Sequence, residues 1–167
     1  MVRGIEHPAM SSEIADAERL LRGILFRHLY WDAGSGQIRV DHGAFLLRPA
    51  DRGELSVQRE ALAATAADAY EDTLRRLARS EAVASLAAGR VREMGLRVGP
   101  RPTAHNPAHA AILGLPEPDW ADMAAPHSER AIDAATMLLA LASLVAHRAQ
   151  SVHALIEELV EAGQVVP

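Results

Sequence analysis

The sequence contains no cysteine, and none of its 17 basic residues is a lysine. Without cysteine, disulfides, zinc–thiolate sites, iron–sulfur clusters and thiol nucleophiles are excluded. Without lysine, Gly34-Ser35-Gly36 cannot belong to a phosphate-binding loop of the G-x-x-x-x-G-K-[ST] type, so we interpret it as a turn. The absence of cysteine is compatible with a reducing compartment, and we expect a cytoplasmic protein.

Long hydrophobic runs are also missing. The longest apolar run, residues 134–146, is interrupted by Thr136 and Ser143, whereas about 20 apolar residues are needed to cross a bilayer. The first ten residues include charged side chains and Pro8, and they lack the apolar core of a signal peptide. The sequence therefore predicts no membrane partner.

Aromatic residues make up 4% of the chain, and its net charge is −5. The charge is uneven, because residues 61–115 hold seven arginines against five acids, whereas residues 116–167 hold two against eight. An acidic chain with few aromatic side chains does not fit nucleic-acid binding well, and we do not expect that partner.

Hydrophobic periodicity predicts an α+β fold, with a small, mostly antiparallel sheet packed by about four helices. We expect a flexible arm at residues 1–10 and one domain at residues 11–167, helical from about residue 127 onward. Apolar residues recur at helical spacing in four segments, residues 12–29, 59–79, 128–148 and 151–162.

Shorter apolar stretches predict strands between residues 37 and 114. Residues 44–48 and 54–57 flank Pro49-Ala-Asp-Arg-Gly53, which is typical of a hairpin turn. The other expected strands are residues 37–40, 82–86, 96–98 and 108–113.

The segment 128–147 is apolar on most sides of its expected helix. Such a helix is either the central core helix or an interface. The first functional hypothesis is therefore a non-enzymatic interaction or assembly subunit that binds itself or another protein. Its expected interface residues are Leu138, Leu141, Leu144 and Val145.

A second hypothesis is a small metal-dependent hydrolase or nuclease-like enzyme centred on His105, Asn106 and His109. Two imidazoles four residues apart could bind a metal ion, and His42 beside Asp41 is a further candidate base. The alternative is a turn whose Asn and His side chains satisfy local backbone groups. Whether the protein is an enzyme stays open, and no cofactor is expected.

A third hypothesis is a nucleic-acid accessory protein. Arginines are concentrated between residues 75 and 101, and if they converge they could bind phosphate or an acidic partner. The alternative is a solvated helix face with internal ion pairs. The arginines that carry the hypothesis are Arg75, Arg76, Arg79, Arg90 and Arg92.

Short motifs follow one another along the chain: AFLLRP at residues 44–49, GELSV at 53–57, GLRV at 95–98 and NPAHAAI at 106–112. In this order they resemble a family of small uncharacterised bacterial proteins that carry G-x-L-S-V … G-L-x-V … N-P-A-H-A-x-I. The resemblance covers residues 26–115 and implies no catalytic residue. It implies an accessory component of a bacterial mobile-element or defence gene cluster.

Overall fold

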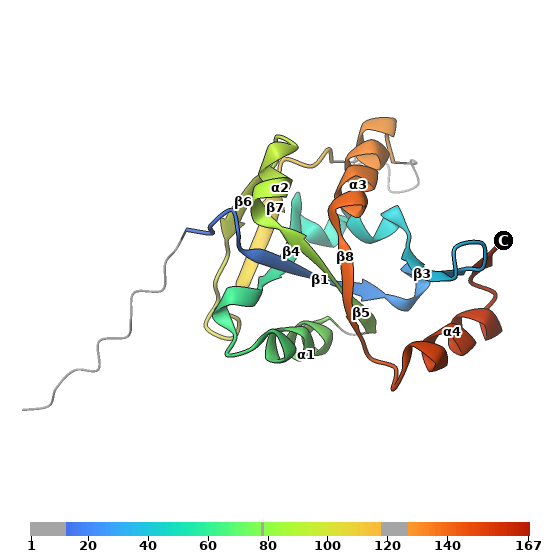
Figure 1. Ribbon diagram of the computed structural model, residues 1–167. Coiled ribbons are helices and arrows are strands. Elements are labelled where there is room, and N and C mark those ends of the chain that lie inside the picture. Colours follow the sequence, from blue (N-terminus) through green and yellow to red (C-terminus); the bar gives the residue numbers. More distant parts are fainter. Residues whose placement is uncertain (1–12, 78, 118–126) are drawn as a thin grey trace, which may run out of the picture.

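The computed structural model describes residues 13–77, 79–117 and 127–167. It has the α+β fold that the sequence predicts (Figure 1). Its strands are β1 (Arg19–Leu25), β2 (Leu29–Asp32), β3 (Gln37–Val40), β4 (Glu54–Arg59), β5 (Ser80–Ala87), β6 (Arg97–Pro100), β7 (His109–Leu113), β8 (Ser143–His147) and β9 (Val165–Val166). Its α-helices are α1 (Ala66–Arg76), α2 (Ala88–Glu93), α3 (Glu129–Leu141) and α4 (Val152–Glu161).

Six strands form an antiparallel sheet in the order β6-β7-β4-β1-β5-β8. A smaller sheet has the order β3-β2-β9, in which β9 runs parallel to β2. Since β1 has neighbours on both sides, it is a central strand of the large sheet. Strand β8 lies at one of that sheet's two edges.

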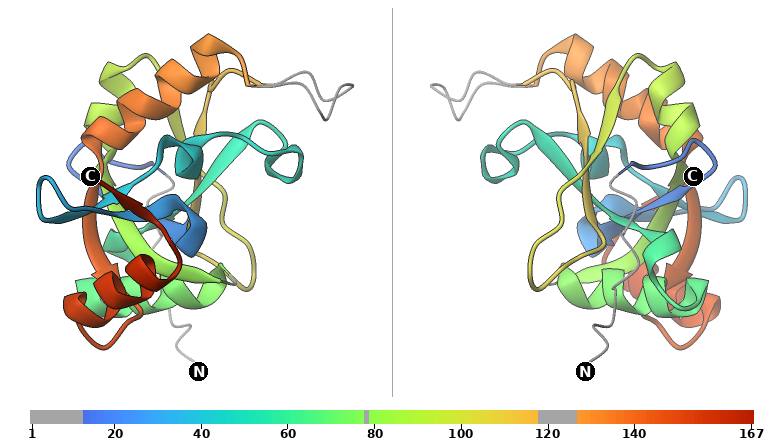
Figure 2. Two further views of the ribbon diagram at one scale, coloured as in Figure 1. Left: turned by 90° about the vertical axis from the view of Figure 1, so that its right-hand side faces the viewer. Right: turned by 90° about the vertical axis from the view of Figure 1, so that its left-hand side faces the viewer.

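The helices cover the two faces of the large sheet unequally. Helices α2 and α3 lie on one face and α1 lies on the other (Figures 1 and 2). The first face carries the main apolar cluster, in which Leu20, Ile112 and Leu138 are fully buried and to which α4 adds Leu155 and Leu159. The α1 face has a much smaller cluster of buried residues, made of Leu21, Ala69 and Val83.

The helix predicted at residues 12–29 is wrong, because this segment contains β1, a 3-10 turn and the start of β2. Side chains on both faces of β1 are buried, since Leu20 and Ile24 join the main cluster and Leu21 joins the small one. A strand buried on both faces is apolar without alternation, so its pattern cannot be distinguished from that of a buried helix.

The predicted helix at 128–148 is correct only as far as Leu141. The chain then becomes extended at Ala142 and continues as β8. The N-caps of α3 and α4 follow the sequence, because Ser128 Oγ accepts from the Ala131 N–H at 3.2 Å and Ser151 Oγ from the Ala154 N–H at 3.0 Å. The helix boundary was missed because apolar residues continue on both sides of it, with Ser143 the single polar residue among residues 137–146.

Two further elements differ from the sequence prediction. Residues 44–48 do not pair with β4, since His42–Phe45 is a 3-10 helix and Pro49–Asp51 is another. Helix α1 starts at Ala66 rather than near residue 59, and Thr65 caps it by accepting from the Asp68 N–H at 3.1 Å. A Thr followed three residues later by an acid was the available N-cap signal.

The arm predicted at residues 1–10 lies outside the described residues. Among the residues that are described, no helix is long and apolar enough to cross a membrane.

Candidate functional site

A cavity of about 290 Å³ opens on the α1 face of the large sheet, where β1 and β4 separate. The two strands pair only at Leu20–Arg59 and Leu21–Gln58. Beyond that point Arg22 and Gly23 of β1 and Ser56 and Val57 of β4 line the cavity. The rest of the wall comes from α1 and its end (Thr73, Arg76, Leu77), the loop before β7 (Thr103, Asn106) and His109.

The register of β4 and β7 places Ser56 beside His109. Gln58 lies directly opposite His109. Ser56 is two residues away on the same strand, so its side chain is on the same face and diagonal to the imidazole. His109 Nε2 lies 3.3 Å from Ser56 Oγ. Ser56 is exposed to solvent, so its hydroxyl group is accessible to a ligand.

The second imidazole nitrogen is held by the main chain. His109 Nδ1 lies 2.9 Å from the carbonyl oxygen of Arg101. Because a carbonyl oxygen can only accept, Nδ1 carries the hydrogen, and in the neutral imidazole Nε2 is left as an acceptor for the Ser56 hydroxyl. The hydroxyl, the imidazole and the orienting carbonyl form a nucleophile–base–orienter arrangement.

An ion pair fixes the residue that orients His109. The Arg101 guanidinium donates to the Glu54 carboxylate at 2.8–3.0 Å, and Glu54 lies two residues before Ser56 on β4. Hydrogen bonds from Arg101 hold the pKa of Glu54 below its usual value. The pair therefore ties Arg101, whose carbonyl orients the imidazole, to the strand that carries Ser56.

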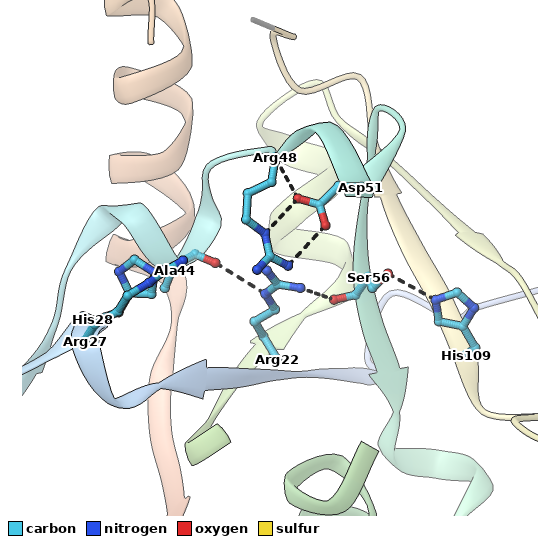
Figure 3. A network of polar contacts seen from close by, with 8 residues as sticks. All are labelled: Arg22, Arg27, His28, Ala44, Arg48, Asp51, Ser56 and His109. Carbon is cyan, nitrogen blue, oxygen red and sulfur yellow. Dashed lines mark hydrogen bonds and ion pairs between the residues drawn. The ribbon is translucent and has the colours of Figure 1, made fainter. Parts of the chain in front are cut away.

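Arg22 is the buried cation of the site, with 7% of its surface exposed. Its guanidinium donates to two main-chain carbonyls, from Nη1 to Ser56 O at 2.9 Å and from Nε to Ala44 O at 3.3 Å (Figure 3). Burial lowers the pKa of Arg22 from its usual value to about 10, so the side chain is charged at neutral pH. A positive charge is thereby held against the main chain of Ser56.

Asp51, whose negative charge acts to raise the pKa of this cation, is itself paired with Arg48. Asp51 accepts from the Arg48 N–H at 2.6 Å and from its guanidinium at 3.3 and 3.4 Å (Figure 3). Within the described part of the chain, Arg22 has no ion pair with a carboxylate.

Two amide side chains of the cavity wall have an unsatisfied oxygen. Gln58 Oε1 and Asn106 Oδ1 are buried and have no hydrogen-bond partner. The backbone N–H of Asn106 donates to Thr103 Oγ1 at 3.0 Å, and this hydrogen bond closes the loop before β7 that carries Thr103 and Asn106. Buried amide oxygens without a donor are rare in folded proteins.

Arg76 brings a second positive charge to the cavity wall. Its Nε donates to Asp72 at 2.6 Å, and Nη1 donates to the carbonyl oxygen of His105 at 3.0 Å. Burial on its own would raise the pKa of Asp72, but the hydrogen bonds from Arg76 and Arg75 bring it below its usual value. Arg76 is therefore largely compensated, in contrast to Arg22.

Of the residues that the metal hypothesis named, His109 and Asn106 line the cavity and His105 does not. His105 is exposed, and only its carbonyl oxygen contacts the site, through Arg76. His42 lies on the 3-10 helix His42–Phe45, with Nδ1 3.8 Å from Asp41, and is not part of this wall. Within the described ranges, no group of three or more His, Cys, Asp or Glu is arranged to hold a metal ion.

The arginines between residues 75 and 92 do not form one surface. Arg75 and Arg76 share Asp72 on α1, whereas Arg90 and Arg92 belong to α2 on the opposite face of the sheet. Arg90 pairs with Glu93, and Arg92 pairs with Asp16. Arg79 follows α1 with a positive φ of 67°. These ion pairs agree with the alternative interpretation of the arginines, a solvated helix face with internal ion pairs.

The four expected interface residues are divided between core and edge. Leu138 is fully buried in the main cluster and Leu141 is half-buried. Leu144 and Val145 are on the edge strand β8, where they line an open groove of about 700 Å³. Trp31, Ile38, Val152 and Ile156 lie along the same groove.

Sequence reasoning missed Ser56 and Arg22. A serine in the middle of a strand has no local pattern, and an arginine within an apolar run was placed on an expected helix. The available signal was the order of the motifs, because GELSV and NPAHAAI carry Ser56 and His109 and become neighbouring strands.

Comparisons with protein-family models, with curated proteins and with solved structures found no match to this chain.

Proposed function

We propose that the protein is a hydrolase in which Ser56 is the nucleophile and His109 the general base. The observation that carries this proposal is the 3.3 Å contact between Ser56 Oγ and His109 Nε2 in the wall of an open cavity. The imidazole is further oriented by the Arg101 carbonyl at 2.9 Å. A base that contacts the nucleophile and is itself held by a third group is the geometry that activates a serine.

The proposed reaction is the cleavage of an ester. His109 Nε2 takes the hydroxyl proton while Ser56 Oγ attacks the ester carbonyl carbon, forming a C–O bond and a tetrahedral oxyanion. The intermediate collapses, the ester C–O bond breaks, and His109 returns the proton to the leaving alcohol. Water then attacks the acyl-serine, giving its proton to His109, which passes it to Ser56 Oγ as the acid leaves.

Arg101 and Glu54 are positioning residues in this scheme. The Arg101 carbonyl keeps the hydrogen on Nδ1, so Nε2 is available as the base. Glu54 holds Arg101 through an ion pair with distances of 2.8–3.0 Å. Arg101 contacts His109 directly and Glu54 acts through Arg101, and neither side chain touches the reacting atoms.

The proposal is tested with a fluorophosphonate probe, which phosphonylates an activated serine with loss of fluoride. We expect the wild-type protein to gain one label at Ser56, measured by intact mass and peptide mapping. Ser56→Ala should not be labelled, and His109→Ala should react at least about 100-fold more slowly, since general-base catalysis contributes about 10²–10⁴-fold.

Ser35→Ala is the matched control, because Ser35 is an exposed serine in the turn before β3. It should be labelled at the wild-type rate. Labelling that persists in Ser56→Ala, or an unchanged rate in His109→Ala, would refute the nucleophile–base assignment.

A second candidate function is self-association through β8. The specific observation is that β8 is an edge strand bordered by the apolar groove that contains Leu144 and Val145. An antiparallel edge strand can pair with its own copy about a two-fold axis, so the candidate partner is a second copy of this chain.

This candidate is tested by light scattering during gel filtration. Val152, 54% exposed and part of the groove, and Val160, 50% exposed and outside it, are both on α4. Val152→Lys should convert a dimer to a monomer, whereas Val160→Lys should leave the mass unchanged. A wild-type monomer, or an equal response to both substitutions, would eliminate the candidate.

A further inference from the structure

The cavity beside Ser56 is electropositive because its buried cation is not neutralised. Arg22 is 7% exposed, and within the described residues it donates only to the carbonyls of Ser56 and Ala44. Buried charges in proteins are normally paired, since removing a charge from water is costly. None of the described residues that line the cavity is an Asp or a Glu.

The surrounding acids supply only part of the missing negative charge, since Asp51 acts on Arg22 without forming an ion pair with it. Asp51 is held by Arg48, Glu54 by Arg101, and Asp72 by Arg75 and Arg76. Each of these carboxylates already has a guanidinium partner within 3.3 Å. The site therefore retains a net positive charge that a bound anion would compensate.

The cavity also offers acceptors that need donors. Gln58 Oε1 and Asn106 Oδ1 are both buried and both unpartnered, and both residues line the cavity. A carboxylate or a fully ionised phosphate monoester group carries only acceptors and cannot satisfy them. A ligand that brings O–H or N–H groups beside its negative charge satisfies the cation and the two amides together.

From these features we infer that the cavity binds a small anion whose neighbouring hydroxyl or amino groups donate to Gln58 and Asn106. Its volume of about 290 Å³ corresponds to roughly ten water molecules, so the ligand has the size of a pentose phosphate or a sugar acid. This inference rests on the proposed hydrolase function and names its substrate class. The anionic group is the part of the ester that the enzyme recognises.

The test measures binding without turnover, by isothermal titration calorimetry on the full chain carrying Ser56→Ala. Ribose 5-phosphate and gluconate are the two probes, because they share hydroxyl groups and a negative charge but differ in the anion. Uncharged ribose and inorganic phosphate are the comparison ligands. We expect ribose 5-phosphate, gluconate or both to bind at least tenfold more tightly than ribose and than phosphate, and their ratio identifies the anion.

Two substitutions separate the contribution of the Arg22 charge to binding from that of the Gln58 amide oxygen. Arg22→Met should weaken the preferred probe at least tenfold, whereas Arg97→Met, which removes an exposed arginine of β6 outside the cavity, should leave its affinity unchanged. Gln58→Leu keeps Arg22 and removes one acceptor, so it should weaken the hydroxylated probe more than inorganic phosphate, which has fewer O–H donors. It keeps the inference testable if Arg22→Met does not fold.

The inference is overturned if ribose binds as tightly as both charged probes, if neither charged probe binds, or if Arg97→Met and Arg22→Met have equal effects. Failure here is distinct from failure of the hydrolase. Labelling of Ser56 by the fluorophosphonate without anion binding would remove the inference and leave the nucleophile. Anion binding without labelling of Ser56 would remove the nucleophile assignment and leave the anion-binding site.

Discussion

On one face of the large sheet, α2, α3 and α4 complete an apolar cluster in which Leu20, Ile112 and Leu138 are fully buried. On the other face, α1 buries only Leu21, Ala69 and Val83, and polar side chains occupy the space beside them. The first face has the close packing that stabilises a domain. The second keeps an open cavity and two unsatisfied amide oxygens, and Arg22 bridges from β1 to the Ser56 carbonyl beside it. Unpartnered polar groups of this kind lower the stability of a fold and are expected at functional sites rather than in a packed core.

Truncation of the packed face should have the largest effect. Leu138 is 0% exposed and lies on α3, so Leu138→Ala removes buried methyl groups that no water can replace. We expect a loss of about 2–5 kcal/mol in the free energy of unfolding, measured by urea denaturation. A loss below about 1 kcal/mol would show that this face is not the main core.

The same truncation on the cavity face should cost less. Leu21 is also 0% exposed, but it lines the 290 Å³ cavity, so the space left by Leu21→Ala joins a volume that solvent already reaches. We expect a loss near 2 kcal/mol, at the low end of the same range. Equal losses for Leu21→Ala and Leu138→Ala would mean that the two faces are packed alike.

Sensitivity to acid should come from His28, on the 3-10 turn Phe26–His28 between β1 and β2. Burial and the positive charge of Arg27 lower the pKa of His28 below its usual 6.5, although Asp41 opposes the shift. The unfolded chain therefore binds this proton more readily than the folded chain. The stability linked to His28 is complete above about pH 6.5 and is lost as the pH falls through the unfolded and then the folded pKa.

His28→Gln tests this linkage. The variant should lose less stability than the wild type between pH 7.5 and pH 5, measured by the urea midpoint at each pH. His153, which is exposed on α4 beside Glu157, provides the control, and His153→Gln should retain the wild-type pH dependence. If the urea midpoints of the wild type and His28→Gln change identically with pH, His28 does not contribute to the pH dependence of stability.

The smallest stability effect is expected at the proposed nucleophile. Ser56 is exposed, and its hydroxyl contacts His109 rather than a buried group, so Ser56→Ala should change the free energy of unfolding by less than about 0.5 kcal/mol. The same substitution should abolish fluorophosphonate labelling. A large destabilisation would indicate a structural role and undo the contrast between the two faces.

Local signals in the sequence were sufficient where an element depends on its own residues. Ser128 and Ser151, each at the first residue of a predicted helical segment, cap α3 and α4, and Gly163, with a φ of 73°, follows the end of α4. The strands near residues 82–86, 96–98 and 108–113 correspond to β5, β6 and β7. Helix caps and turn residues act over a few positions, so they can be read without tertiary structure.

Local signals failed where burial on both faces or strand pairing decides the conformation. The segment 12–29 contains a central strand, and the predicted end of the helix at 148 is an edge strand instead. In both segments apolar residues predominate without a clear strand alternation, and the strand conformation depends on β5 as a hydrogen-bonding neighbour. That neighbour is far away in the sequence, so no local window contains the information.

The candidate site shows the same division. The sequence by itself determined the α+β class and the absence of thiol chemistry, and it named Asn106 and His109 as candidates. Only the tertiary structure decided that His109 meets Ser56, because the β4–β7 register joins residues 53 positions apart. Only it decided that Arg22 is buried without a carboxylate, since the charge balance around a side chain depends on which distant groups fold against it.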